Sequence, residues 1–233
     1  MKLLALDTSG PVCGVAVMAD GKVLFEAATQ NGRNHSISLM PLIDQALTVS
    51  GLKLTDLDRL AVVMGPGSFT GVRIGISTAK GLAHGANLPC VAVDALEALA
   101  KGAELFRGLI CPIQDARGGQ VYAALFAADG HGLTRRMEDQ PIAVTDLCSK
   151  LKSESRPVLF VGDGMPVHRA TIAEALGDQA VFAAPHLSYL RPAAVAGLAA
   201  QATDLLDYRS LMPLYLRAPN AERNKQLLEA MHA

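Results

Sequence analysis

The chain has 233 residues, half of them hydrophobic and 18% charged, which suits one large domain or two small ones with ample material for a buried core. The formal net charge of −1 excludes the basic surface field of a protein that binds tRNA unaided. The low charged fraction also predicts that a partner covers part of an apolar surface.

Three short strands are predicted at the start of the chain. Residues 2–6 form a buried strand that ends at Asp7, and residues 13–19 and 22–29 form two more strands. The last two are joined by Asp20-Gly21, a dipeptide typical of hairpin turns. The sequence therefore predicts a three-stranded antiparallel meander.

From Asn34 onward the apolar residues recur at helical spacing. Leu39, Ile43 and Leu47 fall on one stripe, and Gly51 ends the pattern. Asn34 or Ser36 is a suitable N-cap for this helix.

A glycine-rich turn then joins a buried strand at 60–64 to a helix at 72–85. The turn consists of Gly65, Pro66, Gly67, Ser68, Phe69, Thr70 and Gly71. It departs from the phosphate-binding P-loop because no Gly-Lys-Ser/Thr ends it, and from the nucleophile elbow because Pro66 and Thr70 stand where glycines are needed. We therefore interpret Ser68 as an N-cap.

The second half of the chain repeats the order of the first. After a strand at 90–93 and a helix at 95–105, a strand ends at Asp115, followed by the turn Ala116-Arg117-Gly118-Gly119. A further strand ends at Asp129-Gly130, much as the second strand ends at Asp20-Gly21. This similarity predicts a duplicated unit. We expect one lobe at 1–106 and a smaller lobe at 107–233, whose C-terminal helix packs back on the first.

The remaining sequence is less regular. Residues 131–157 are the least structured in appearance. The segments expected after them are a strand at 158–161, the turn Gly162-Asp163-Gly164, helices at 167–176 and 192–206, and a charged, partly helical tail at 214–233.

No other sequence feature points to a metal, a disulfide or a membrane. Four cysteines occur without a C-x-x-C pair, which favours reduced core residues. The apolar run at the start of the chain ends at Asp7, so it is shorter than the ~7–15 apolar residues of a signal peptide. No apolar run approaches the ~20 residues of a membrane span. We expect a cytoplasmic protein.

Three polar turns follow strands and suggest nucleotide loops. Two hairpin turns can present N–H groups to phosphates, and a glycine turn can admit an adenosine. This arrangement resembles the superfamily of actin, sugar kinases and chaperone ATPases. It implies an α/β, two-lobed actin-like ATPase (ribonuclease H-like) fold with duplicated, hairpin-containing mixed sheets. The nucleotide-loop-like residues, either functional or vestigial, are Asp7, Thr8, Ser9, Asp115, Gly162 and Gly164.

The long motif from Gly65 to Gly75, which includes Arg73, resembles the signature of the TsaB (YeaZ) family. Supporting segments are Leu4 to Ser9, Asn34-His35, Asp115-Ala116-Arg117 and Pro213 to Arg217, so the resemblance covers nearly the whole chain. It implies a subunit of the bacterial complex that adds a threonylcarbamoyl group to adenosine in tRNAs. The implied partners are the catalytic paralogue TsaD and the ATPase TsaE, with tRNA reached through the complex.

One departure separates this chain from the catalytic paralogue. TsaD-like proteins place two histidines four residues apart on the helix after the motif, where both can hold a metal. Ala95 and Leu99 stand at the matching positions. We expect no metal, no catalysis by this chain alone, no cofactor of its own, and ATP binding at most weak or only within the complex. Among the scattered histidines, only His35 merits a test, and a locally hydrogen-bonded surface residue is the favoured interpretation.

Two other functions stay open. An independent ATP-dependent phosphotransferase is disfavoured because the second hairpin carries Ala116-Arg117 in place of a small, polar phosphate loop. A glycoprotease-like peptidase is disfavoured by the missing metal pair and the incomplete nucleophile elbow.

The helix at 72–85 is unusually rich in small residues. Gly71 and Gly75 share one face of it, which close packing on the protein's own sheet or on a partner helix would explain. Partner docking, to TsaD or to a second copy of this chain, is the sharper hypothesis. The predicted interface consists of Leu39, Ile43, Leu47, Gly71, Ile74, Gly75, Ser77 and Thr78.

Overall fold

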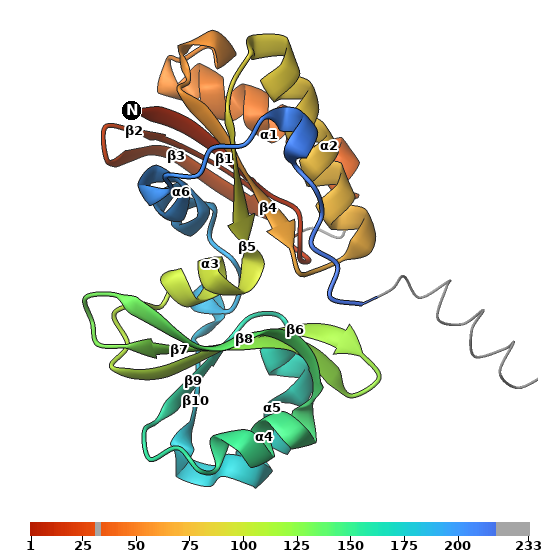
Figure 1. The fold of residues 1–233 in the computed structure, drawn as a ribbon, viewed down its shortest axis with the longest axis vertical. Helices are drawn as coiled ribbons and strands as arrows, with labels where there is room; N and C mark the ends of the chain where they lie inside the picture. The colour runs from red at the N-terminus through yellow and green to blue at the C-terminus, as the bar shows by residue number, and fades with distance from the viewer. Residues whose placement is uncertain (31–33, 218–233) are drawn as a thin grey trace, which may run out of the picture.

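Two five-stranded mixed sheets, one above the other along the long axis, form the framework of the protein (Figure 1). The computed structural model describes residues 1–30 and 34–217. The first sheet contains β1 (Lys2–Asp7), β2 (Cys13–Ala19), β3 (Lys22–Thr29), β4 (Arg59–Gly65) and β5 (Cys90–Asp94). The second contains β6 (Gly108–Arg117), β7 (Gln120–Ala128), β8 (Leu133–Ala143), β9 (Val158–Val161) and β10 (Ala180–Phe182).

The two sheets share one strand topology. The order is β3-β2-β1-β4-β5 in the first and β8-β7-β6-β9-β10 in the second. In each, the leading strand pairs antiparallel with its hairpin partner and parallel with the strand that follows a helix. The predicted opening meander and the duplicated mixed-sheet, actin-like fold are therefore confirmed.

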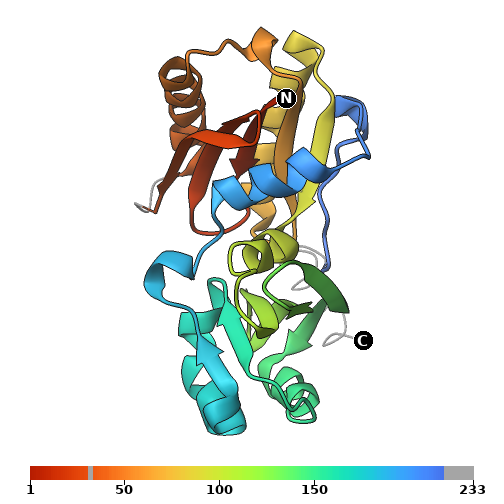
Figure 2. The ribbon, with the colours of Figure 1, turned by 90° about the vertical axis from the view of Figure 1, so that its left-hand side faces the viewer.

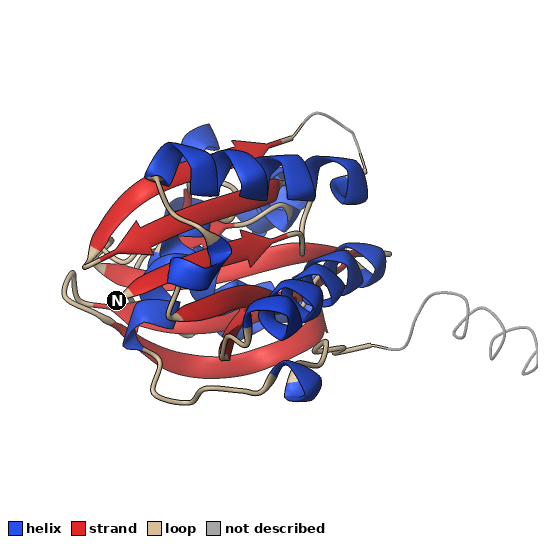
Figure 3. Cartoon of the chain, turned by 90° about the horizontal axis from the view of Figure 1, so that it is seen from above, coloured by secondary structure: helices blue, strands red, loops and turns tan. Residues whose placement is uncertain are grey.

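Helices cover the sheets in separate layers. The helices are α1 (His35–Ser50), α2 (Phe69–Ala86), α3 (Ala95–Lys101), α4 (Val144–Leu151), α5 (Gly164–Leu176) and α6 (Pro192–Gln201). A core of buried side chains lies between the first sheet and the pair α1 and α2, and another lies between the second sheet and the pair α4 and α5. Figure 3 shows these layers from above, with the strands among the helices.

A third core joins the two halves. It includes Leu3 of β1, Leu96 of α3, Phe126 of β7 and Val195 of α6, all of them almost fully buried. The helix α6 lies across β1 and β2, and α3 lies between the sheets (Figures 1 and 2). Since both halves contribute side chains to this core, it holds them together. Truncating one of its buried leucines to alanine would cost about 2–5 kcal/mol of stability.

The helix boundaries follow from local capping. The Asn34 side chain accepts the Ser36 N–H at 3.2 Å, and Gly51 ends α1 in the left-handed conformation. The Ser68 hydroxyl accepts the Gly71 N–H at 3.3 Å and begins α2. The N-cap Ser68 is therefore confirmed, and of the two candidates Asn34 and Ser36 the structure selects Asn34. Each cap satisfies an amide that the helix itself leaves unpaired.

Several boundary predictions are wrong, among them the start of α2, which is Phe69 and not residue 72. Residues 131–157, predicted to be the least structured, contain β8 and α4. The polar residues of β8 belong to an edge strand with one face open to water, where such residues are tolerated. The helix after β5 ends at Lys101, and α5 starts at Gly164. The helix α6 stops at Gln201 because Leu206 instead exchanges two 2.8 Å backbone hydrogen bonds with Cys90.

The end of the chain is described only in part. The predicted helical tail at 214–233 lies mostly outside the described residues, and 214–217 are not helical. None of the helices within the described residues is long and apolar enough to span a membrane.

Candidate functional site

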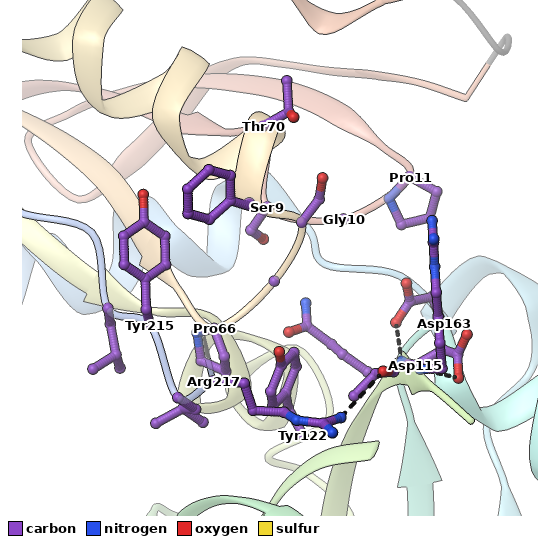
Figure 4. Close-up of a pocket in the computed structure, with 18 residues that line it drawn as sticks. Ser9, Gly10, Pro11, Pro66, Thr70, Asp115, Tyr122, Asp163, Tyr215 and Arg217 are labelled. Atoms are coloured by element: carbon purple, nitrogen blue, oxygen red, sulfur yellow. Dashed lines mark hydrogen bonds between the residues drawn. The ribbon is translucent and has the colours of Figure 1, made fainter. Parts of the chain in front are cut away.

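A cleft of about 650 Å³ lies where the two halves face each other (Figure 4). The N-terminal wall comprises Ser9, Gly10 and Pro11 with Pro66 to Thr70. The opposite wall comprises Gln114 to Arg117, Tyr122 and Asp163, and one side is formed by Leu214 to Arg217. Of the predicted nucleotide-loop residues, the structure brings Ser9 and Asp115 to this cleft.

The first polar turn is bonded within itself. Asp7 is buried, and its Oδ1 accepts the Ser9 N–H at 2.8 Å and the Ser9 hydroxyl at 2.7 Å. The Thr8 hydroxyl donates to the Gly71 carbonyl oxygen at 2.7 Å. Burial raises the pKa of the Asp7 carboxyl, although its bonds to Ser9 oppose the shift. Asp7 and Thr8 therefore hold the turn in its conformation by hydrogen bonds, and neither lines the cleft.

His35 connects the first turn with α1. Its Nε2 lies 2.9 Å from the Gly10 carbonyl oxygen, and the side chain is half-buried. The partner lies 25 positions away and is therefore not local, and the ring is less exposed than the sequence suggests. Its place is structural, because it fixes Gly10 at the wall of the cleft.

The second polar turn carries carboxyl groups where a phosphate would need donors. The Asp115 N–H donates to Asp163 Oδ1 at 3.3 Å, and the Arg117 N–H donates to Asp115 Oδ1 at 3.2 Å. His168 Nε2 lies 3.2 Å from the same Asp115 oxygen. Burial raises the pKa of Asp163 to about 6. The hairpin bends at Gly118-Gly119, because β6 continues through Arg117, so the predicted turn at 116–119 is two residues too long.

The glycine motif allows two backbones to touch. A Cβ on Gly67 would lie 2.3 Å from the Ser9 carbonyl oxygen, and one on Gly71 would lie 2.1 Å from that of Thr8. The Ser68 N–H also donates to the Ser9 oxygen at 2.7 Å. The motif therefore seats the start of α2 against the first turn, a contact that any side chain would block.

Gly162 and Gly164 serve a similar role in the second half. A Cβ on Gly162, whose φ is +103°, would lie 2.2 Å from the Ile113 carbonyl oxygen. A Cβ on Gly164 would lie 3.1 Å from that same oxygen. The two glycines thus pack the start of α5 on β6, and neither lines the cleft.

An aromatic and arginine stack at the cleft mouth was not predicted from the sequence. The Arg73 guanidinium lies 3.8 Å from the centroid of the Phe69 ring, and the Tyr215 ring stacks on Phe69 at 4.8 Å. Arg217 Nη1 reaches the Ala116 carbonyl oxygen at 3.4 Å. The segment Leu214 to Arg217 therefore connects α2 with β6, as Figure 4 shows. In the sequence, these positions were marked only by the family-like segments Gly65 to Gly75 and Pro213 to Arg217.

Half of the predicted interface lies inside the protein. Leu39 and Ile43 are 1% and 2% exposed and belong to the core under the first sheet. Gly71 and Gly75 pack against Thr8, whose hydroxyl oxygen would lie 2.5 Å from a Cβ on Gly75. These four residues cannot contact a partner while the chain stays folded, so this part of the prediction is corrected. The side chains of Leu47, Ile74 and Thr78 are half-buried, and Ser77 is exposed.

The outward surface of α1 and α2 uses different residues. Ile37 and Met40 of α1 are 63% and 48% exposed. Gly81 and Gly85 of α2 have open space where a Cβ would be. We call these four residues, with Ser77, the outer helix face.

The expected metal positions are filled by apolar packing. Ala95 is fully buried and Leu99 nearly so, both in the core between the sheets. The cavity beside Leu99 has a volume of only about 10 Å³. Among the described residues, no group of three or more His, Cys, Asp or Glu side chains is placed to hold a metal ion.

Comparisons with known proteins agree on one family. The family model described as "TsaD: tRNA N6-adenosine threonylcarbamoyltransferase" matches residues 25–225. The TsaB protein of Bacillus subtilis, named as a tRNA threonylcarbamoyladenosine biosynthesis protein, is 37% identical over 95% of this chain and 96% of its own length. The TsaB protein of Escherichia coli is 38% identical over 70% of this chain and 72% of its own length.

Solved structures show the same fold. YeaZ from Pseudomonas aeruginosa superposes with a TM-score of 0.76 at 26% identity, over 92% of this chain and 99% of that one. A second Pseudomonas aeruginosa structure, described as similar to peptidase YEAZ, has a TM-score of 0.79 at 26% identity and covers 93% and 99% of the two chains.

Proposed function

This chain belongs to the TsaB family of tRNA threonylcarbamoyladenosine biosynthesis proteins, and from that premise we propose that it is a non-catalytic subunit that binds and positions TsaD. In this role it acts in the cytoplasm, with TsaE as a further partner and with tRNA contacted through the complex. The observation that carries the proposal is the apolar packing of Ala95 and Leu99 at the metal positions of the catalytic paralogue.

Catalysis by this chain is disfavoured by the chemistry of those two positions. Alanine and leucine offer no metal-binding atom, and a cavity of about 10 Å³ beside Leu99 leaves room for little more than one water molecule. A metal-activated reaction would therefore need the active site of a partner. Two chains of the same fold can differ in function, so the catalytic chain can carry the reactive groups while this chain carries a docking surface.

We propose that ATP, the cofactor of many proteins of this fold, binds this chain at most weakly or only within the complex. Loops that bind phosphate offer free backbone N–H donors, and a carboxylate close to a phosphate repels it unless a cation lies between them. Here the Ser9 and Asp115 amides are already bonded to Asp7 and Asp163, and Asp115 and Asp163 line the opposite wall. We therefore propose that this chain has no nucleotide cofactor of its own.

The outer helix face is the docking surface that we propose for TsaD. It combines the apolar side chains of Ile37 and Met40 with the bare backbone of Gly81 and Gly85. Small residues let two helices approach closely, and exposed apolar side chains favour burial against a partner. Because TsaD resembles this chain in fold, two helices from each chain can pair about a pseudo-two-fold axis, and a homodimer can use the same face.

The two alternative functions have weaker support. A phosphotransferase needs phosphate loops, which the bonded turns at Asp7 and Asp115 do not offer. A peptidase function is suggested only by the wording attached to one similar structure. The Ser68 hydroxyl is the N-cap of α2, and within the described residues no histidine is hydrogen-bonded to it.

Reconstitution tests the proposal directly. The pure chain alone is expected to modify no tRNA and to hydrolyse neither ATP nor peptides. Added to TsaD, TsaE, tRNA and the threonylcarbamoyl donor, it is expected to be required for formation of the modified adenosine. Full modification without this chain, or activity of this chain alone, would refute the proposed role.

A further inference from the structure

One side of α2 carries positive charge and no negative charge. From residue 59 to residue 93, a span that includes all of α2, the sequence contains no aspartate or glutamate, although the whole chain has 22 of them. Lys80 follows Arg73 by seven residues and His84 follows Lys80 by four, so the three side chains share one side of the helix. In a chain whose formal net charge is −1, this row is a local excess of positive charge.

The segment after α6 runs beside this row and adds a further cation. Lys80 Nζ lies 3.5 Å from the Arg209 carbonyl oxygen, and the Tyr208 ring packs edge-on against His84 with 4.9 Å between centroids. The Arg209 side chain is 77% exposed, and its Nε lies 3.2 Å from Asp207, so its charge is paired in part. Figure 1 shows this segment descending beside α2 toward the second half of the protein.

Two aromatic rings and a guanidinium end the row at the cleft mouth. Phe69 precedes Arg73 by one turn of α2, and the Tyr215 ring stacks on Phe69. Tyr215 is 40% exposed, so part of its ring is open to a ligand. Arg73 is exposed and bonds Tyr215 through Nε alone, which leaves its two Nη groups for an anion. The row therefore alternates cations with an aromatic platform.

Surfaces that bind single-stranded nucleic acid have this composition. Cations follow the phosphate backbone, and unpaired bases stack on aromatic rings and on arginine planes. The interior of the cleft is unsuited to phosphates, because Asp115 and Asp163 line its far wall. A polyanion would therefore follow the outside of α2. An acidic peptide would pair with the cations but would make no use of an open aromatic platform, so RNA fits better.

We propose that tRNA contacts this chain directly at a basic strip, with unpaired bases stacked on the aromatic platform and the adjoining phosphates on the cations. The basic strip consists of Phe69, Arg73, Lys80, Arg209 and Tyr215. The inference rests on the proposed function, in which the chain acts within a complex with TsaD, and it adds an RNA contact to the docking role.

The basic strip and the outer helix face are separate sides of α2. Gly81 follows Arg73 by eight residues, which places it roughly 80° around the helix. TsaD bound to the outer helix face would therefore leave the basic strip beside the interface. Few cations are present in this strip, so affinity for tRNA should be high only when TsaD supplies further contacts.

The test is the affinity of the TsaD complex for tRNA across a salt series from about 50 to 250 mM. Arg209→Gln should weaken binding at least about threefold and lower the slope of log K against log salt by about 0.7–1, because one phosphate contact is lost. Lys152→Gln is the matched control, since it neutralises an exposed cation after α4, at the far end of the protein from α2 (Figure 1). It should change neither value.

The stacking platform has its own pair of variants. Tyr215→Ala should weaken tRNA binding about fivefold or more, because a base loses its stacking partner, whereas Tyr215→Phe keeps the ring and should bind nearly as the wild type does. Calorimetry should give Arg209→Gln the TsaD affinity of the wild type, since Arg209 is outside the outer helix face. Unchanged tRNA affinity and salt slope in both Arg209→Gln and Tyr215→Ala would overturn the inference and leave the proposed function intact. Loss of TsaD binding with unchanged tRNA binding would make the strip a protein interface, which also overturns it.

The isolated chain provides an arm that needs no TsaD. At low salt, photocrosslinking to an RNA hairpin with 4-thiouridine in its loop should yield crosslinked peptides that contain Phe69 or Tyr215. Crosslinks confined to other peptides, or none at all, would contradict the inference. If the wild type fails to bind TsaD, the proposed function is refuted, and the crosslinks alone decide whether the basic strip binds RNA.

Discussion

Arg73 and Tyr215 lie 142 positions apart in the chain and are joined by a 2.7 Å hydrogen bond from the Arg73 Nε to the Tyr215 hydroxyl. The bond forms beside the Phe69 ring, which both side chains contact. Arg73 is on α2, and Arg217, two residues after Tyr215, contacts Ala116 of β6. The bond from Arg73 to Tyr215 therefore anchors the segment Leu214 to Arg217 across the cleft mouth. It connects the helix proposed to meet the partner with the second half of the protein.

Replacing Tyr215 tests that anchor. Tyr215→Ala should reduce the free energy of unfolding by about 1–2 kcal/mol, since it removes an aromatic stack and a hydrogen bond at a partly exposed site. Tyr215→Phe keeps the stack and should cost about half as much. Urea denaturation measures both values. Equal stability of Tyr215→Ala and the wild type would show that the segment contributes nothing to folding.

The outer helix face can be tested without loss of the fold. Gly81→Arg places a large charged side chain in open space, and it should leave the monomer equally stable or more stable, by up to ~1 kcal/mol, because arginine favours a helix over glycine. We expect at least a tenfold loss of TsaD binding in calorimetry. Ala173→Arg on the exposed side of α5 is the matched control and should bind normally. Full binding by Gly81→Arg would place the interface elsewhere.

Leu39 and Ile37 are neighbours on α1 with opposite expected effects. Leu39→Ala should destabilise the protein by about 2–5 kcal/mol, because its side chain is in the core. Ile37→Ala should change stability by less than about 0.5 kcal/mol, because its side chain is exposed, but should weaken TsaD binding. Chemical denaturation and calorimetry of the two variants give the comparison. The reverse pattern would show that the stripe assigned to the core is the docking surface.

Nucleotide binding provides a further test. Millimolar Mg-ATP should raise the melting temperature of the isolated chain by less than about 1 °C, since a ligand stabilises a protein by RT ln(1 + [L]/Kd), which is small when the ligand concentration lies below Kd. A shift of several degrees would mean that the turns at Ser9 and Asp115 release their amides to phosphate. The same titration with the TsaD complex distinguishes a site on this chain from one on its partners.

Asp163 should give the protein a pH dependence below neutrality. Its folded-state pKa is raised by burial to about 6, so the folded chain binds more protons than the unfolded chain between about pH 4 and 6. Stability from this group is complete below pH 4 and is lost as the pH rises through 6, by about 1–3 kcal/mol. Asp163→Asn should remove that loss in melts between pH 4 and 7, whereas Asp146→Asn, at the exposed start of α4, should not. An unchanged slope in Asp163→Asn would mean that Asp163 titrates normally.

The sequence alone determined the framework of this protein. Local patterns were sufficient for the opening meander, for the N-cap Ser68 and for the repeated hairpin, because strand alternation and helix capping depend on residues close together in the chain. They left Asn34 and Ser36 as alternatives for the first N-cap. The glycine motif and the replacements at Ala95 and Leu99 were also sufficient to suggest the family and its non-catalytic role, since they are identities at fixed positions.

Tertiary structure decided which faces are buried and which groups meet. The stripe through Leu39 and Ile43 has the same spacing whether it faces a sheet or a partner, so only the packing of α1 on the first sheet assigned it to the core. β8 was missed because its polar residues form an edge strand, paired with β7 on one side only. The contacts of Tyr215 with Arg73 and of Asp94 with Arg135 join residues far apart in the chain. Such pairs leave no periodic signal, because their proximity exists only after both sheets have formed and docked.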